Sequence, residues 1–290
     1  MKFANPRNDI AFKKIFGNTN HKEILISFLN AILNFKNEEE IKDVEILNPY
    51  QVPKIEDLKE TILDIKATNK KDKNFIVEMQ KKNLNDFAKR SLYYTAKSYV
   101  EQLDSGVIYE NLQKVYFIGI CDFKIFDSKH YISRHLILNK ETLKNDLADF
   151  EFAFIELPKF KNKLDDLNSV IDKWTYFIKK ADKVDYIPKE LSEVTEIKEA
   201  YNIITQHKWS KEELKVYDYV LKKESEAESA LRTAEMNGVK QGLKQGLEQG
   251  LEQGRKERDI AIAKNLLAVL DNQTIAQTTG LSVDEIELLR

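Results

Sequence analysis

Cysteine is almost missing from this sequence, since Cys121 is the single cysteine among 290 residues. One cysteine excludes a disulfide framework and a cysteine-rich zinc site. The chain also lacks a run of about 18 uninterrupted apolar residues, which a membrane-spanning helix needs. The first residues turn polar too soon for a signal peptide. These absences predict a cytoplasmic protein with no membrane partner.

An excess of one charge is missing as well. The 46 Lys and Arg residues nearly balance the 48 Asp and Glu residues, and the formal net charge is −2. This balance excludes the simplest signature of a nucleic-acid-binding protein, a strongly basic chain. Residues 59–97, however, contain ten basic and five acidic side chains, a local charge of +5. We expect DNA to contact this segment, although a solvated helix face would also explain the charge run.

Apolar periodicity predicts a mixture of helices and strands, and a hydrophobic content of 42% predicts a folded chain. Apolar residues at spacings of three and four indicate helices, whereas short apolar runs indicate buried strands. The expected helices are residues 9–16, 24–33, 84–103, 164–181, 193–207 and 211–236, and the expected single strands are residues 115–120, 131–138 and 151–157.

Two alternating runs, residues 62–68 and 74–80, surround a polar loop and predict a β-hairpin. If Thr68 lies opposite Asn74, one face of the hairpin is uniformly apolar, whereas a slip of one residue would mix the two faces. In this register the apolar face pairs Leu63 with Met79, Ile65 with Val77 and Ala67 with Phe75, and the other face pairs Asp64 with Glu78, Ile62 with Gln80 and Lys66 with Ile76.

The pairing of Asp64 with Glu78 is the feature that indicates chemistry. Two carboxylates about 5 Å apart destabilise a sheet unless they share a proton or bind a cation. Their hard oxygen ligands suit Mg²⁺, Mn²⁺ or Ca²⁺, and such an ion can bind a phosphodiester and activate water. Gln80 could then orient that water, and Lys66 could supply positive charge to the transition state. The alternative is a pair of solvated positions on an exposed sheet face.

Several short motifs, in their order along the chain, resemble one family. The matching pieces are residues 9–17, 63–65, 76–80, 90–94, Gly106 with Tyr109, 155–160, 174–177 and the glycine tetrads near the C-terminus. Together they resemble the Rpn family of recombination-promoting nucleases, often labelled transposases, within the PD-(D/E)xK nuclease superfamily. The resemblance covers nearly the whole chain, and each motif alone is short.

The resemblance implies an α/β fold, with a mixed central sheet flanked by helices and a helical C-terminal region after it. It also implies a bacterial, divalent-metal-dependent endonuclease that acts on double-stranded DNA in recombination or in defence against foreign DNA. The alternatives are a non-catalytic nuclease-fold module that binds DNA or protein, and a transposase.

Carried onto this chain, the resemblance makes Asp64 the central metal ligand and Glu78 the second, joined by the backbone carbonyl of Met79. Mg²⁺ is the expected ion, with Mn²⁺ or Ca²⁺ as alternatives. Gln80 stands where the superfamily motif has lysine, so the positive charge must come from elsewhere, and Lys66 is preferred to Lys13. Asp9 is either the acid of the first helix or an N-cap carboxylate. The residues expected to contact DNA are Lys70, Lys71, Lys81, Lys82, Lys89 and Arg90.

The chain is expected to divide into a nuclease core (1–160), a helical region (161–237), a glycine repeat (238–254) and a helix-turn-helix-like segment (255–290). Glycine recurs at every fourth position of the repeat, as in a linker or a close-packed helix pair. The last helix carries Asp284, Glu285 and Glu287, the wrong charge for phosphate, so the final segment is expected to contact protein. A homo-oligomer formed through the C-terminal helices is one such contact.

Overall fold

The structure, a computed structural model, describes every residue except 49, 52–60, 83–85 and 104–107. Gly106 and the expected start of a helix at residue 84 therefore lie outside the described residues. The chain forms two compact units, Met1–Leu221 and Lys222–Arg290. The division into four parts remains a prediction.

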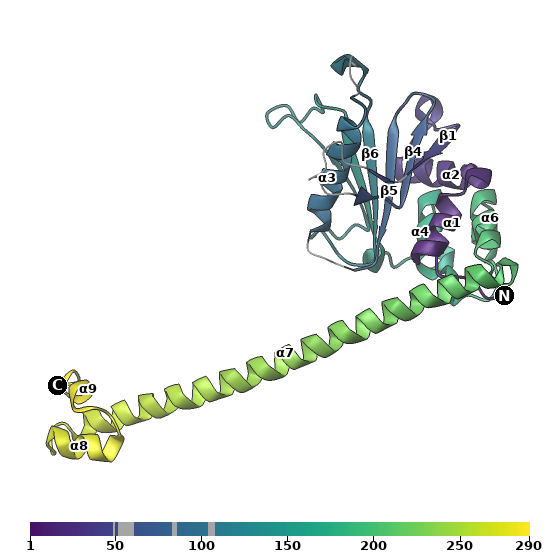
Figure 1. Cartoon of the computed structure of the whole chain (residues 1–290). Helices are drawn as coiled ribbons and strands as arrows, with labels where there is room; N and C mark the ends of the chain where they lie inside the picture. Colours follow the sequence, from purple (N-terminus) through teal and green to yellow (C-terminus); the bar gives the residue numbers. More distant parts are fainter. Residues whose placement is uncertain (49, 52–60, 83–85, 104–107) are drawn as a thin grey trace. The chain divides into compact units, whose positions relative to one another are not determined.

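A mixed six-stranded sheet forms the centre of the first unit (Figure 1). Its strands follow the order β1-β4-β5-β6-β8-β7, in which β5, β6 and β8 are parallel and the remaining pairs are antiparallel. A separate two-stranded pairing joins β2 and β3. The strands are β1 (Val44–Leu47), β2 (Tyr50–Gln51), β3 (Thr61–Ile62), β4 (Ile65–Asn69), β5 (Asn74–Gln80), β6 (Val115–Cys121), β7 (Ile132–Leu136) and β8 (Phe150–Glu156).

The β4–β5 hairpin has the register that the alternation predicts, with Ile65 opposite Val77 and Thr68 opposite Asn74. The prediction for Leu63 is wrong, because β4 begins only at Ile65. Leu63 is fully buried with Ile76 on the other face of the sheet. The regular ladder ends there, since the Asp64 amide binds the Glu78 side chain.

One face of the sheet packs against α1, α2, α4 and α6 (Figure 1). Their buried aromatic side chains meet edge to face or tilted, as in the contacts of Trp174 with Phe28 and Phe177. The helices after residue 160 therefore contribute to the same hydrophobic core as the first two helices. Their bounds are α1 (Asp9–Phe16), α2 (Lys22–Leu33), α4 (Val170–Lys180), α5 (Lys189–Ser192) and α6 (Thr195–Ile203).

The opposite face is covered by α3 (Phe87–Val100). Phe87, the first residue of this helix, contacts Phe117 and Phe154 of the sheet. Gly119 of β6 makes this close approach possible, because a Cβ atom built there would lie 2.7 Å from Phe154 and 3.1 Å from Phe87. The hairpin face that carries Glu78 is therefore an interior surface.

The second unit contains the rest of α7 (Lys211–Leu266), followed by α8 (Asn272–Thr279) and α9 (Val283–Glu287). α7 continues through the glycine repeat, and among the described residues no atom outside the adjoining helix backbone lies within 4 Å of a Cβ atom built at any repeat glycine. Gly280 has a φ of 77°, and Ser282 caps α9 through a capping box with Glu285. The end of the chain thus consists of a helix, a left-handed glycine and a capped short helix. No helix among the residues described combines the length and apolar character that crossing a membrane requires.

Candidate active site

Asp64 and Glu78 lie at one edge of the sheet, where β4 begins and β5 ends. The amide of Asp64 donates to Oε1 of Glu78 at 3.0 Å, and the amide of Met79 donates to Oδ2 of Asp64 at 2.8 Å. Each carboxylate thus takes the place of a backbone carbonyl that a longer ladder would offer. The two acids are held by the backbone, and their positions follow from the hairpin register.

Burial dominates the electrostatics of this pair. Glu78 is 6% exposed and the side chain of Asp64 is 19% exposed. Burial raises the pKa of Glu78, and the charge of Asp64 raises it further. Burial also raises the pKa of Asp64, and the neighbouring Asp9 carboxylate adds to this effect. Without a cation the pair therefore favours a retained proton, and Glu78 is not a solvated position on an exposed face.

Helix α1 brings an acid and a cation to the pair. Asn8, and not Asp9, is the N-cap, since its side chain accepts from the Ile10 amide. Asp9 is the first helical residue, and its Oδ1 lies 2.9 Å from Nζ of Lys13. The same ammonium is 3.8 Å from Oδ1 of Asp64. Burial lowers the pKa of Lys13, but the Asp9 hydrogen bond and the nearby carboxylates outweigh it and raise the pKa overall.

Lys66, the preferred source of positive charge, is engaged elsewhere. Its Nζ binds Oε2 of Glu101 at 2.7 Å, at the C-cap of α3. The structure therefore places Lys13, and not Lys66, next to the Asp64 carboxylate. Sequence spacing alone had favoured the lysine on the hairpin, because α1 reaches the site only through the tertiary fold.

Gln80 is held by α3. Nη2 of Arg90 donates to Oε1 of Gln80 at 2.8 Å, and Nε2 of Gln80 donates to the carbonyl of Lys82 at 3.1 Å. The Arg90 guanidinium also lies over the rings of Phe87 and Tyr94, at 5.5 and 5.8 Å. Arg90, expected to contact DNA, thus also orients the residue that replaces the motif lysine.

Tyr94 is a site residue that the sequence analysis did not assign. Burial raises the pKa of its hydroxyl, and the charges of Glu78 and Asp64 contribute to the increase. Its position four residues after Arg90 places both side chains on one face of α3. That spacing was the available signal, but it does not show which face of the helix meets the acids.

The oxygen atoms at this edge suit a hard divalent cation. The Gln80 carbonyl accepts from the Asp122 amide, on the β6 side, while the Met79 amide points to Asp64, on the β4 side. Because successive peptide groups of a strand point to opposite sides, the Met79 carbonyl also points toward the β4 side. Within the described ranges, no group of at least three His, Cys, Asp or Glu side chains is placed to hold a metal ion. The candidate donors at this edge are two carboxylates and one carbonyl.

The predicted DNA contacts divide between the two edges of the sheet. Lys70 and Lys71 lie in the hairpin turn, next to the first residue of β5. Glu78 lies four residues further along this strand, which is a distance of about 13 Å. Lys81 and Lys82 directly follow β5 at the edge of the acid pair. Lys89 is exposed near the start of α3. The structure therefore brings Lys81, Lys82, Lys89 and Arg90 to the acid-pair side, and it does not bring Lys70 and Lys71 there.

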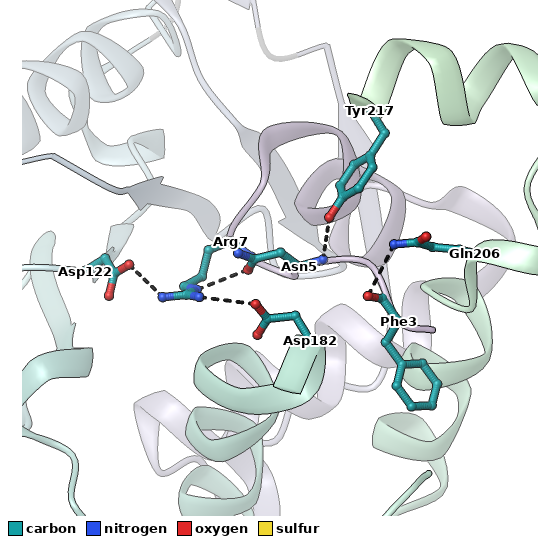
Figure 2. Close-up of polar contacts among 7 residues, drawn as sticks. All are labelled: Phe3, Asn5, Arg7, Asp122, Asp182, Gln206 and Tyr217. Atoms are coloured by element: carbon teal, nitrogen blue, oxygen red, sulfur yellow. Dashed lines mark hydrogen bonds and ion pairs between the residues drawn. The ribbon is translucent and has the colours of Figure 1, made fainter. Parts of the chain in front are cut away.

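Arg7 fixes the segment that leads into α1 (Figure 2). Its guanidinium lies 2.8 Å from Asp122, directly after β6, and 3.6 Å from Asp182, just after α4. The side-chain oxygen of Asn5 accepts from Nε of Arg7, and the backbone amide of Asn5 donates to the hydroxyl of Tyr217. These contacts join the chain before Asp9 to the same edge of the sheet. The sequence contained no signal for Arg7, because its partners are distant in the chain.

Comparisons with known proteins bear on the family of the chain. No curated protein and no solved structure matches the chain significantly. A family model described as PD-(D/E)XK nuclease family transposase matches residues 6–234. The matched segment contains α1, the hairpin with Asp64 and Glu78, and α3. The chain therefore belongs to the PD-(D/E)XK nuclease family transposases, as the sequence resemblance predicted.

Proposed function

We propose that the chain is a divalent-metal-dependent endonuclease that hydrolyses phosphodiester bonds of double-stranded DNA, in recombination or in defence against foreign DNA. Family membership supports a nuclease- or transposase-like function. The observation that carries the proposal is the buried pair Asp64 and Glu78, fixed by reciprocal backbone hydrogen bonds at a sheet edge. Two buried carboxylates repel each other unless they share a proton or bind a cation, so this pair favours a role in chemistry.

Asp64, Glu78 and the carbonyl of Met79 would hold the cation. Mg²⁺ is the preferred ion, because it keeps several waters and takes only one or two carboxylates besides substrate phosphates. Mn²⁺ and Ca²⁺ have the same preference for oxygen ligands. When bound, the ion supplies Lewis-acid polarisation of the phosphodiester and a lower pKa for a coordinated water.

Two cationic side chains support the reaction, Lys13 directly and Arg90 through Gln80. Lys13 presents its ammonium beside Asp64, held there by Asp9, where it neutralises charge on the reacting phosphate. Arg90 fixes the amide of Gln80, which orients the attacking water. A catalytic role for Lys66 rests on the sequence alone, because its ammonium is paired with Glu101.

A second copy of the chain is the partner we propose for the C-terminal helices. Val239, Leu243, Leu247 and Leu251 recur every fourth residue on α7 and are 56–74% exposed. Each follows a repeat glycine, so a neighbouring helix could approach the backbone closely. Gel filtration of a Leu243→Glu/Leu247→Glu variant tests this, and an unchanged elution volume would contradict it.

Cleavage of supercoiled plasmid with and without Mg²⁺ tests the proposed activity. Asp64→Asn removes one buried charge and should lower the cleavage rate by about 100-fold or more, as when a transition-state contact is lost. The matched control is Asp72→Asn, on the hairpin turn, where a positive φ of 54° suits asparagine. Calorimetric titration with Mg²⁺ should show weaker binding for Asp64→Asn only. Cleavage by Asp64→Asn at the wild-type rate would refute the proposal, and DNA binding without cleavage under any divalent ion would favour the non-catalytic alternative.

A further inference from the structure

A polar pocket lies at the same edge of the sheet as the acid pair. It has a volume of about 500 Å³, and it is lined by residues 124–129 after β6 and by Pro158, Lys159 and Lys161 after β8. Four lysines line the pocket, with Asp127 as the only acid of its lining. Lys124, Lys129 and Lys161 are exposed. The lining therefore combines a hollow with a net positive charge.

A buried ion pair builds this pocket. Glu156 is 1% exposed, and its Oε2 accepts from the amides of Ile125 at 2.7 Å and Phe126 at 3.3 Å. Its Oε1 accepts from Nζ of Lys159 at 2.6 Å, and the same Nζ donates to the Phe126 carbonyl at 2.7 Å. These contacts join the loop after β6 to the turn after β8. The walls of the pocket are thus held in place before any ligand arrives.

Lys159 also offers a donor to the pocket. Its side chain is only 7% exposed, and a lysine ammonium carries three N–H donors. The contacts with Glu156 and Phe126 use two of them. The third N–H, on a cation that lines the pocket, suits an anionic oxygen.

The strand register relates the pocket to the acid pair. Gln80, Cys121 and Glu156 lie side by side at the ends of the parallel strands β5, β6 and β8. Because side chains alternate along a strand, Glu78 and Glu156 both belong to the face that α3 covers. Two strand spacings separate β5 from β8, or about 10 Å. A polyanion seated on the acid pair can therefore extend along this edge to the pocket.

We infer that this pocket binds a backbone phosphate of the DNA that occupies the acid pair, a few nucleotides from the scissile bond. The inference rests on the proposed function. Lysine ammonium groups neutralise phosphate without reading bases, so the contact would position the duplex and not select a sequence. The pocket also supplies, on the acid-pair edge, the positive charge that the distant Lys70 and Lys71 do not.

Duplex binding measured by fluorescence anisotropy, without divalent metal, tests the inference. The double variant Lys124→Gln/Lys161→Gln is compared with Lys140→Gln/Lys144→Gln, two exposed lysines in the loop at the opposite edge of the sheet. Each lost phosphate contact lowers the slope of log K against log salt by about 0.9. We expect the pocket variant to lose about 1 to 2 units of slope and the control variant to keep the wild-type slope.

Equal slopes for the pocket variant and the wild type would overturn the inference, and so would equal losses in both variants. Calorimetry with inorganic phosphate forms a second arm. Binding of free phosphate that only the pocket variant loses, together with unchanged duplex binding, would assign the pocket to a small anion and overturn the DNA assignment. A pocket-dependent slope in a protein that never cleaves would keep the inference and reject the proposed hydrolysis.

Discussion

Gly119 offers a strict test of how the acid-pair face is packed. It lies in the ladder between Glu78 and Phe154, and an added Cβ would meet two atoms of the Phe154 ring at 2.7 and 2.9 Å and one of Phe87 at 3.1 Å. Ordinary contacts of such an atom begin near 3.4 Å. The new methyl group therefore overlaps two buried rings, one from β8 and one from α3.

We expect Gly119→Ala to lower the free energy of unfolding by about 1–3 kcal/mol, the usual cost of overpacking a core. For a domain of about 200 residues, each kcal/mol lowers the melting temperature by about 2–4 °C. Differential scanning calorimetry and urea unfolding measure the change. The same substitution at Gly246, which has no atom within 4 Å of its added Cβ, should instead stabilise α7 by up to about 1 kcal/mol. A Gly119→Ala protein that melts at or above the wild-type temperature would refute this account of the packing.

Two further predictions concern the charges of the site. Burial raises the carboxyl pKa of Glu78 in the folded protein. Glu78 therefore leaves the metal-free fold most stable at a pH below the ordinary carboxyl pKa, and this stability is lost as the pH rises through the pKa of the folded state. Glu78→Gln should remove this loss and stabilise the metal-free protein at alkaline pH, by about 1.4 kcal/mol for each unit by which burial raises the pKa. Urea unfolding in EDTA at pH 5 and pH 9 measures the change, and an unchanged pH dependence would contradict the burial argument. Lys13→Met should reduce kcat for plasmid cleavage by about 100-fold. Lys66→Met should mainly destabilise the fold, by about 1–3 kcal/mol, because Glu101 loses its partner. A larger loss of kcat in Lys66→Met than in Lys13→Met would show that Lys66 is the catalytic lysine.

The hairpin shows what a single sequence can predict. Alternation fixes which residues share a face, so the pairs from Ile65 to Thr68 followed from the apolar pattern alone. Leu63 broke the pattern because a side chain replaced the backbone partner at Asp64, and no periodicity records such a substitution. The local rule therefore predicted the ladder but not the point at which it ends.

The choice between Lys13 and Lys66 shows where sequence analysis stops. Lys66 is close to Asp64 in the chain, whereas Lys13 is close to Asp64 only in the fold. The burial of Glu78 depends in the same way on α3, whose covering face is decided by contacts with β6. The hairpin register predicted that Asp64 and Glu78 are neighbours, but tertiary packing decides which cations and which other residues surround them.

The contact between the two acids and the contact that anchors α1 join residues at very different separations along the chain. The acids are joined by hydrogen bonds across 14 and 15 residues, whereas the Arg7–Asp122 contact that anchors α1 spans 115 residues. Short loops close at lower entropic cost and faster than long ones. We therefore expect the two carboxylates to meet during folding before Lys13 reaches them, and a divalent cation to take the place of Lys13 at that stage. Stopped-flow refolding should accelerate with Mg²⁺ in the wild type and not in Asp64→Asn, so equal acceleration in both would exclude this order of assembly.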